Sequence, residues 1–187
     1  MIDSDHHGVE RLKAIEVENI FSFSMTEPEN LFLDETFLKL MAKQLLMDEA
    51  IVENIKSDVI ALLQKEIELQ SSNYVSTKIN YYFKDSHVSK GNTPTEVMSN
   101  YTKFTQEIKI EEWHEQRLLE LKEIIENNDY PKTLSLFNNK GLKSIANKHF
   151  KISDFTERAL KLLQFQSETH EMIRKYFPTG ITNKNGL

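Results

Sequence analysis

The stretch Asp48–Gln70, which reads DEAIVENIKSDVIALLQKEIELQ, decides the fold of this chain. Its apolar residues recur every three or four positions over about five helical turns. The positions are Ile51, Ile55, Val59, Leu62, Leu63, Ile67 and Leu69. This spacing is typical of an amphipathic α-helix. We therefore expect a long helix from near Asp48, which either continues through Tyr74 to Phe83 or breaks at Ser71-Ser72-Asn73.

Helical patterns lie on both sides of this stretch. Asp34 is a plausible N-cap because its carboxylate can accept a hydrogen bond from the first turn. The apolar stripe after it is Phe37, Leu38, Met41, Leu45 and Leu46. Asp85–Thr93 reads as a loop, and Pro94 suits the first turn of a helix capped by Thr93. Further helices are expected at Pro94–Glu107, Glu111–Asn127, Pro131–Phe137, Gly141–His149 and Asp154–Tyr176.

The composition favours one helical domain. The chain has 187 residues, enough for a hydrophobic core, and only 5 Gly and 4 Pro, which favours long helices over a turn-rich β fold. Cysteine is absent, which excludes a disulfide framework, a thiolate nucleophile and a cysteine zinc site. This usage points to a reducing, cytoplasmic compartment.

Charge and hydropathy bear on two classes of partner. The net charge of -6 gives no broad electrostatic attraction for nucleic acid, although local basic patches remain possible. No apolar run approaches the roughly 20 residues that a membrane-spanning helix needs. We expect no membrane partner.

The first 33 residues have a different pattern from the rest. Met1–Asp3 and Val17–Met25 read as strands, with a short amphipathic helix at Gly8–Ile15 between them. The expected fold class is therefore mainly α, with a short strand–helix–strand remnant of an α/β sheet. The expected organisation is an incomplete α/β segment at 1–33, a helical region at 34–177 and a flexible tail at 178–187.

The acidic motif Asp3-Ser4-Asp5 follows the first predicted strand. Two carboxylates at such a strand end can ligate Mg²⁺ or Mn²⁺ and leave positions open for water and phosphate. Solvated turn aspartates are the alternative interpretation. His6 and His7 come next, and they either contact the metal or a phosphate or are exposed bystanders.

Glu27 and Glu29 flank Pro28 after the second predicted strand. Since sites in α/β sheets gather at the carboxyl ends of strands, both glutamates could reach the edge that carries Asp3 and Asp5. Alternatively, Glu29-Asn30 caps the following turn.

Three segments in order, IDSDHH at 2–7, NIFSF at 19–23 and EPENLFLD at 27–34, carry a resemblance. They resemble the closing portion of a TOPRIM-like domain. The particular relatives are a bacterial domain-of-unknown-function family (number 4435), encoded near AAA-type ATPases in phage-defence loci, and the nuclease half of the overcoming-lysogenization-defect proteins. The segment NKGL at 139–142 loosely resembles a Gly-Lys-containing segment of their helical part.

The resemblance implies Asp3 and Asp5 as ligands of Mg²⁺ or Mn²⁺, supported by Glu29, with Asn30 in the later signature. The upstream glutamate, which resembles a general acid/base in these families, has no counterpart in residues 1–187. We therefore expect a truncated or split TOPRIM-like phage-defence protein, related to metal-dependent nucleases and inactive alone. It would act on nucleic acid only when a missing N-terminal part or another polypeptide completes the site.

A second hypothesis belongs to a different class. The amount of amphipathic helix, together with an unpaired N-terminal strand edge, favours a helical interaction module that binds an AAA-type ATPase or itself as a homo-oligomer. A degraded remnant without a function of its own is the third interpretation.

Overall fold

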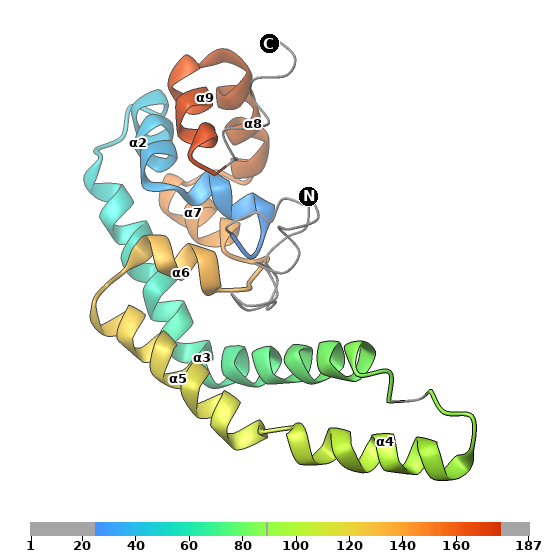
Figure 1. Cartoon of the computed structure of the whole chain (residues 1–187). Coiled ribbons are helices and arrows are strands. Elements are labelled where there is room, and N and C mark those ends of the chain that lie inside the picture. Colours follow the sequence, from blue (N-terminus) through green and yellow to red (C-terminus); the bar gives the residue numbers. More distant parts are fainter. Residues whose placement is uncertain (1–24, 89, 177–187) are drawn as a thin grey trace.

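The computed structural model describes residues 25–88 and 90–176, and this part of the chain is helical with no strand (Figure 1). The elements in chain order are η1 (Pro28–Leu33), α2 (Glu35–Gln44), α3 (Ala50–Asp85), α4 (Pro94–Glu107), α5 (Ile110–Glu126), α6 (Tyr130–Leu136), α7 (Lys143–Phe150), α8 (Phe155–Phe165) and α9 (Ser167–Arg174). The mainly α fold class is confirmed. The predicted strands and the 178–187 tail lie outside the described residues, apart from Met25.

Helix α3 is continuous over 36 residues, so the stretch Ser71-Ser72-Asn73 does not break it. The helix nevertheless changes direction along its length, where its colour turns from teal to green (Figure 1). The buried Ser71 lies in this part of the helix, and its hydroxyl donates to the Ile67 carbonyl at 2.9 Å. Back-bonding of a serine to the preceding turn is a known cause of helix bending.

The cap of α2 is confirmed, and its apolar stripe is confirmed in part. An Asp34 carboxylate oxygen accepts from the Thr36 amide at 2.8 Å. Phe37, Leu38 and Met41 are fully buried. Leu46 is 94% exposed, so its assignment to the stripe was wrong. The helix ends at Gln44, and Leu46 takes a positive φ of 54° in the turn that follows, which carries its side chain away from the core.

The C-terminal helix predicted over Asp154–Tyr176 is two helices, α8 and α9. Gln166 between them is extended, with φ -120° and ψ 117°. In one continuous helix Gln166 would follow Leu162 on the buried stripe, where an amide has no partner. With the break, its carbonyl accepts from the Thr169 hydroxyl at 2.6 Å in the first turn of α9.

The core lies in a body made from η1, α2, the first half of α3, the end of α5, and α6 to α9 (Figure 1). Its largest fully buried side chains include Phe37, Phe137, Phe155, Ile55 and Leu63. Phe150 and Phe155 stack at 6.1 Å between ring centroids, joining α7 to α8. Residues from both ends of the described chain therefore share one hydrophobic cluster.

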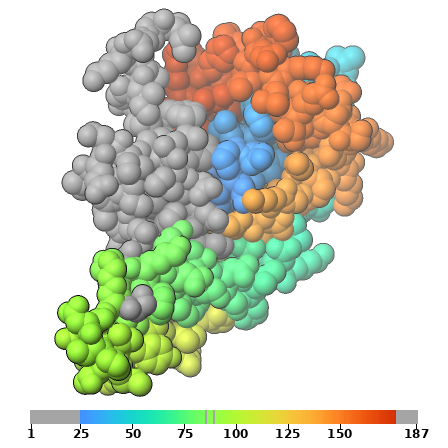
Figure 2. Space-filling view, turned by 90° about the vertical axis from the view of Figure 1, so that its right-hand side faces the viewer, coloured from blue at the N-terminus to red at the C-terminus, as the bar shows by residue number. Residues whose placement is uncertain are grey.

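The second half of α3 and helix α4 project from this body as an arm (Figure 1). In the space-filling view, their green surface forms the lower end of the molecule (Figure 2). Helix α5 packs along α3, and Lys78 of α3 lies over the Trp113 ring at 4.5 Å. No helix in the described ranges is long and apolar enough to cross a bilayer.

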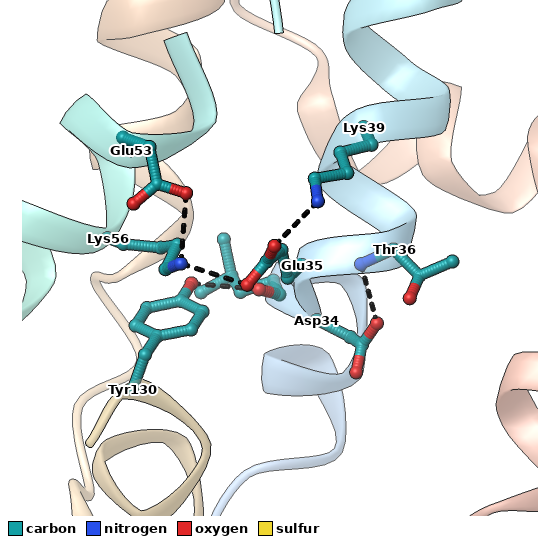
Figure 3. A network of polar contacts seen from close by, with 8 residues as sticks. Asp34, Glu35, Thr36, Lys39, Glu53, Lys56 and Tyr130 are labelled. Carbon is teal, nitrogen blue, oxygen red and sulfur yellow. Dashed lines mark hydrogen bonds and ion pairs between the residues drawn. The ribbon is translucent and has the colours of Figure 1, made fainter. Parts of the chain in front are cut away.

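A polar network fastens the start of α2 to α3 and α6 (Figure 3). The Lys56 ammonium of α3 donates to Glu35 at 2.9 Å and to Glu53 at 3.0 Å. The Tyr130 hydroxyl of α6 donates to the Leu33 carbonyl at 2.8 Å. Burial raises the pKa of Tyr130 well above its usual range, so its hydroxyl stays a donor.

Replacing Tyr130 with Phe tests the buried hydrogen bond. The Leu33 carbonyl would lose its donor, and we expect the free energy of unfolding to fall by about 1–2 kcal/mol. Urea denaturation gives this value. Tyr101→Phe is the control, because Tyr101 is 52% exposed. An equal loss in both variants would contradict the role given to Tyr130.

Acid should weaken the network through Glu35. Hydrogen bonds from Lys39 and Lys56 hold the pKa of Glu35 below its usual value. A lowered pKa in the folded state contributes stability that is present above the unfolded-state pKa and is lost as the pH falls. Because Glu35 is 40% exposed, we expect Glu35→Gln to cost less than about 1 kcal/mol at pH 7.

This cost should shrink towards zero at pH 3, measured as the difference in urea midpoint from the wild type. Glu126→Gln on α5 should show no such pH dependence, since Glu126 is exposed and forms no ion pair with the described residues. If the difference in urea midpoint between Glu35→Gln and the wild type grows on acidification, ionised Glu35 does not stabilise the network.

Candidate functional site

The predicted site residues fall into two groups. Asp3, Asp5, His6 and His7 lie outside the described residues, so their predicted metal role stays a prediction. Glu29 and Asn30 lie in η1, where Glu29 is exposed and Asn30 is only 2% exposed.

Asn30 has a clear structural partner. Its side-chain amide donates to the Leu134 carbonyl in α6 at 3.3 Å. This contact joins η1 to a segment 104 positions later in the sequence. The signature residue Asn30 therefore helps to hold the body together.

Glu27 is more buried than Glu29, although sequence patterns alone did not distinguish the two glutamates. Its side chain is 9% exposed, and an oxygen lies 3.9 Å from the Lys140 ammonium. Pro28 occupies the first turn of η1, and the Asn30 amide donates to the Glu27 carbonyl at 2.9 Å. This short turn buries Glu27 and Asn30, three positions apart, and leaves Glu29 towards solvent.

The loop after α6 is fastened to the start of η1. The buried Thr26 hydroxyl donates to the Phe137 carbonyl at 2.9 Å, across 111 positions of sequence. The Asn139 carboxamide oxygen accepts from the Gly141 amide at 2.7 Å, which folds Asn139–Gly141 into a tight turn. A Cβ at position 141 would lie 2.9 Å from that oxygen, so glycine suits the turn.

Helix α3 supplies the third side of this site. The Asn139 amide nitrogen lies 3.2 and 3.1 Å from the two Glu66 oxygens. The Gln70 amide, one turn along α3, donates to the Asn138 carbonyl at 3.0 Å. Gln70 is 2% exposed, and its carbonyl oxygen has no hydrogen-bond partner among the described residues.

We call these residues the junction: Glu27, Glu66, Gln70, Asn139 and Lys140. The junction combines carboxylates, carboxamides and one ammonium from three separate segments. Lys140 is 83% exposed and holds its charge beside Glu27. A lysine in this setting can contact a phosphate oxygen as a mobile point charge.

Among residues 25–88 and 90–176, no three histidine or acidic side chains are grouped to ligate a metal ion. The predicted metal ligands Asp3 and Asp5 lie outside the described residues.

Sequence patterns missed Glu66 and Gln70. Both lie in a long helix whose polar residues look like an ordinary solvated face, and only the fold brings them against the loop at 138–141. The segment at 139–142 was noticed through its resemblance alone.

Comparison of the sequence with protein families and characterised proteins, and of the structure with solved structures, finds no match.

Two neighbouring residues of the junction should contribute differently to stability. We expect Asn139 to stabilise the fold, and Lys140 to remain free to contact a ligand. Asn139→Ala removes the bonds to Glu66 and Gly141, and we expect it to lower the free energy of unfolding by about 1–2 kcal/mol. Lys140→Ala removes a 3.9 Å ion pair between an exposed lysine and the buried Glu27, and should cost less than about 1 kcal/mol. Urea denaturation of both variants checks this, and a larger loss for Lys140→Ala would show a structural lysine instead.

Proposed function

We propose that this chain supplies the metal-binding aspartates and the helical portion of a TOPRIM-like nuclease site in a phage-defence protein. Asp3 and Asp5 would bind Mg²⁺ or Mn²⁺. The catalytic glutamate that the resemblance implies would come from polypeptide outside residues 1–187. Nucleic acid is then the substrate of the completed site.

One observation carries this proposal. The two described segments with the resemblance, 27–34 and 139–142, lie far apart in the sequence and meet at the junction. Glu27 lies beside Lys140, and Thr26 and Asn30 bind the end of α6 and the loop after it. A carboxylate and an exposed ammonium at one place suit a site that handles a metal ion and a phosphodiester.

The test is Mn²⁺ binding to the purified chain, followed as loss of the electron paramagnetic resonance signal of free Mn²⁺. We expect binding that Asp3→Ala and Asp5→Ala each weaken at least tenfold. Glu126→Gln should leave it unchanged, which controls for loss of surface charge. Absence of Mn²⁺ binding in the millimolar range would overturn the proposal.

The same preparation tests the expected lack of activity. We expect no cleavage of DNA or RNA with Mg²⁺ or Mn²⁺, because the glutamate is missing from the site. Cleavage that Asp3→Ala abolishes would contradict that expectation while it supports the nuclease class.

A second candidate function is a helical interaction module, and the arm favours it. Helix α4 has 14 residues and buries only Phe104. Isolated helices of about 12–15 residues are marginal in water, so α4 would gain stability from a partner. An AAA-type ATPase and a second copy are the two partners that the sequence suggested.

A further inference from the structure

The outer end of the arm carries an apolar surface with a hollow in it. We call this surface the arm tip, and it comprises Phe83 of α3 and Val97, Met98 and Tyr101 of α4. Met98 and Tyr101 are the most exposed, at 65% and 52%, and Phe83 and Val97 are 42% and 37% exposed. The hollow has a volume of about 650 Å³ and is also lined by Val88 and Pro94. Exposed apolar surfaces of this kind mark interaction sites.

Contacts inside the arm fix this surface. The Phe104 ring packs against Phe83 at 5.5 Å and Tyr82 at 6.2 Å between centroids. The Tyr82 hydroxyl donates to Glu107 at 2.8 Å, and the Asn100 amide donates to the Lys90 carbonyl at 2.7 Å. These contacts hold α4 beside the end of α3 but leave Met98 and Tyr101 uncovered.

The exposed face of α4 is neutral. Pro94, Met98, Tyr101 and Thr105 follow one another at helical spacing and so share a face, which carries no charge. Glu96 and Lys103 are displaced from this face by two positions, which turns them away from it. In a chain of net charge -6, two copies can meet at such a face without placing like charges together.

The arm tip also contains both halves of a self-complementary contact. Met98 and Tyr101 are 65% and 52% exposed and also line the hollow, so exposed apolar side chains and a recess belong to one patch. A two-fold interface uses the same patch on both subunits, so it needs a protrusion and a recess within one patch. The protruding side chain of each copy can then enter the recess of the other.

The patch is small for a dimer interface, so its polar neighbours must enlarge it. Its four apolar side chains are 37–65% exposed, whereas each partner of a standard interface buries roughly 800 Å². Neutral polar residues of the same helical face would supply the remainder. The arm projects from the body, so the arm tip lies away from the hydrophobic core (Figure 1).

We propose that the arm tip is a homodimer interface, in which two copies pair about a two-fold axis and bury Met98 and Tyr101 in each other's hollow. Two helical arms thereby form a four-helix contact, a common way to complete a core from helical hairpins. This inference rests on the interaction-module candidate and is independent of the nuclease proposal.

Light scattering after size exclusion, on the full chain over a range of concentrations, tests the interface. We expect a species of twice the monomer mass of 21.9 kDa, with a dissociation constant that Met98→Glu raises at least tenfold. Leu119→Glu is the matched control, since Leu119 on α5 is also 65% exposed but lies outside the arm tip. Far-ultraviolet circular dichroism establishes that both variants keep their helices.

Cross-linking gives a second, independent readout because the chain has no cysteine. Under oxidation, Met98→Cys or Tyr101→Cys should form a covalent dimer, whereas Leu119→Cys should not. A wild-type chain that stays monomeric at several hundred micromolar overturns the homodimer, as does a dimer that Met98→Glu leaves intact. The second candidate function, a helical interaction module, is contradicted only if the chain also fails to co-purify with an AAA-type ATPase from the same locus.

Discussion

Burial of one face of the first half of α3 is the constraint on which the rest of the structure depends. Val52, Ile55, Val59 and Leu63 are fully buried, and α2, α5, α6 and α7 all pack against this helix. Each fully buried aliphatic side chain contributes about 1.5–3 kcal/mol relative to an exposed one. The short helices around α3 are too small to be stable alone, so their positions follow from the face that they cover.

Arg117 shows how a charged residue serves the same framework. It lies in α5 and is 6% exposed. Its guanidinium donates to Glu120 at 2.6 Å and to the Leu136 carbonyl at 3.1 Å. The guanidinium also lies 5.0 Å from the centre of the Tyr74 ring. Breaking such a buried arrangement by removing one partner is costly, because a charge is left without compensation. Arg117 thus joins α3, α5 and the end of α6 next to the junction.

Apolar spacing and capping residues were enough to predict most of the helices. Asp34 and Thr93 cap α2 and α4 as expected, because a side-chain oxygen before a helical pattern is a local signal. Leu46 and Gln166 were misplaced, since the ends of helices depend on turn geometry and on which face the body covers. Two of the five junction residues could not be predicted for a similar reason: Glu66 and Gln70 become site residues only through contacts with a loop about 70 positions later. The role of Asp3 and Asp5 rests on the resemblance.

The bend of α3 has a consequence that reaches beyond packing. Gln70, which holds the loop of the junction, directly precedes Ser71, whose hydroxyl bonds back into the helix. The arm tip continues from the other side of this point, so one continuous helix links the two places. If this helix has two bend angles, a ligand that prefers one of them at either place must change the affinity at the other place by the same factor. The bend of α3 would then couple the junction to the arm tip.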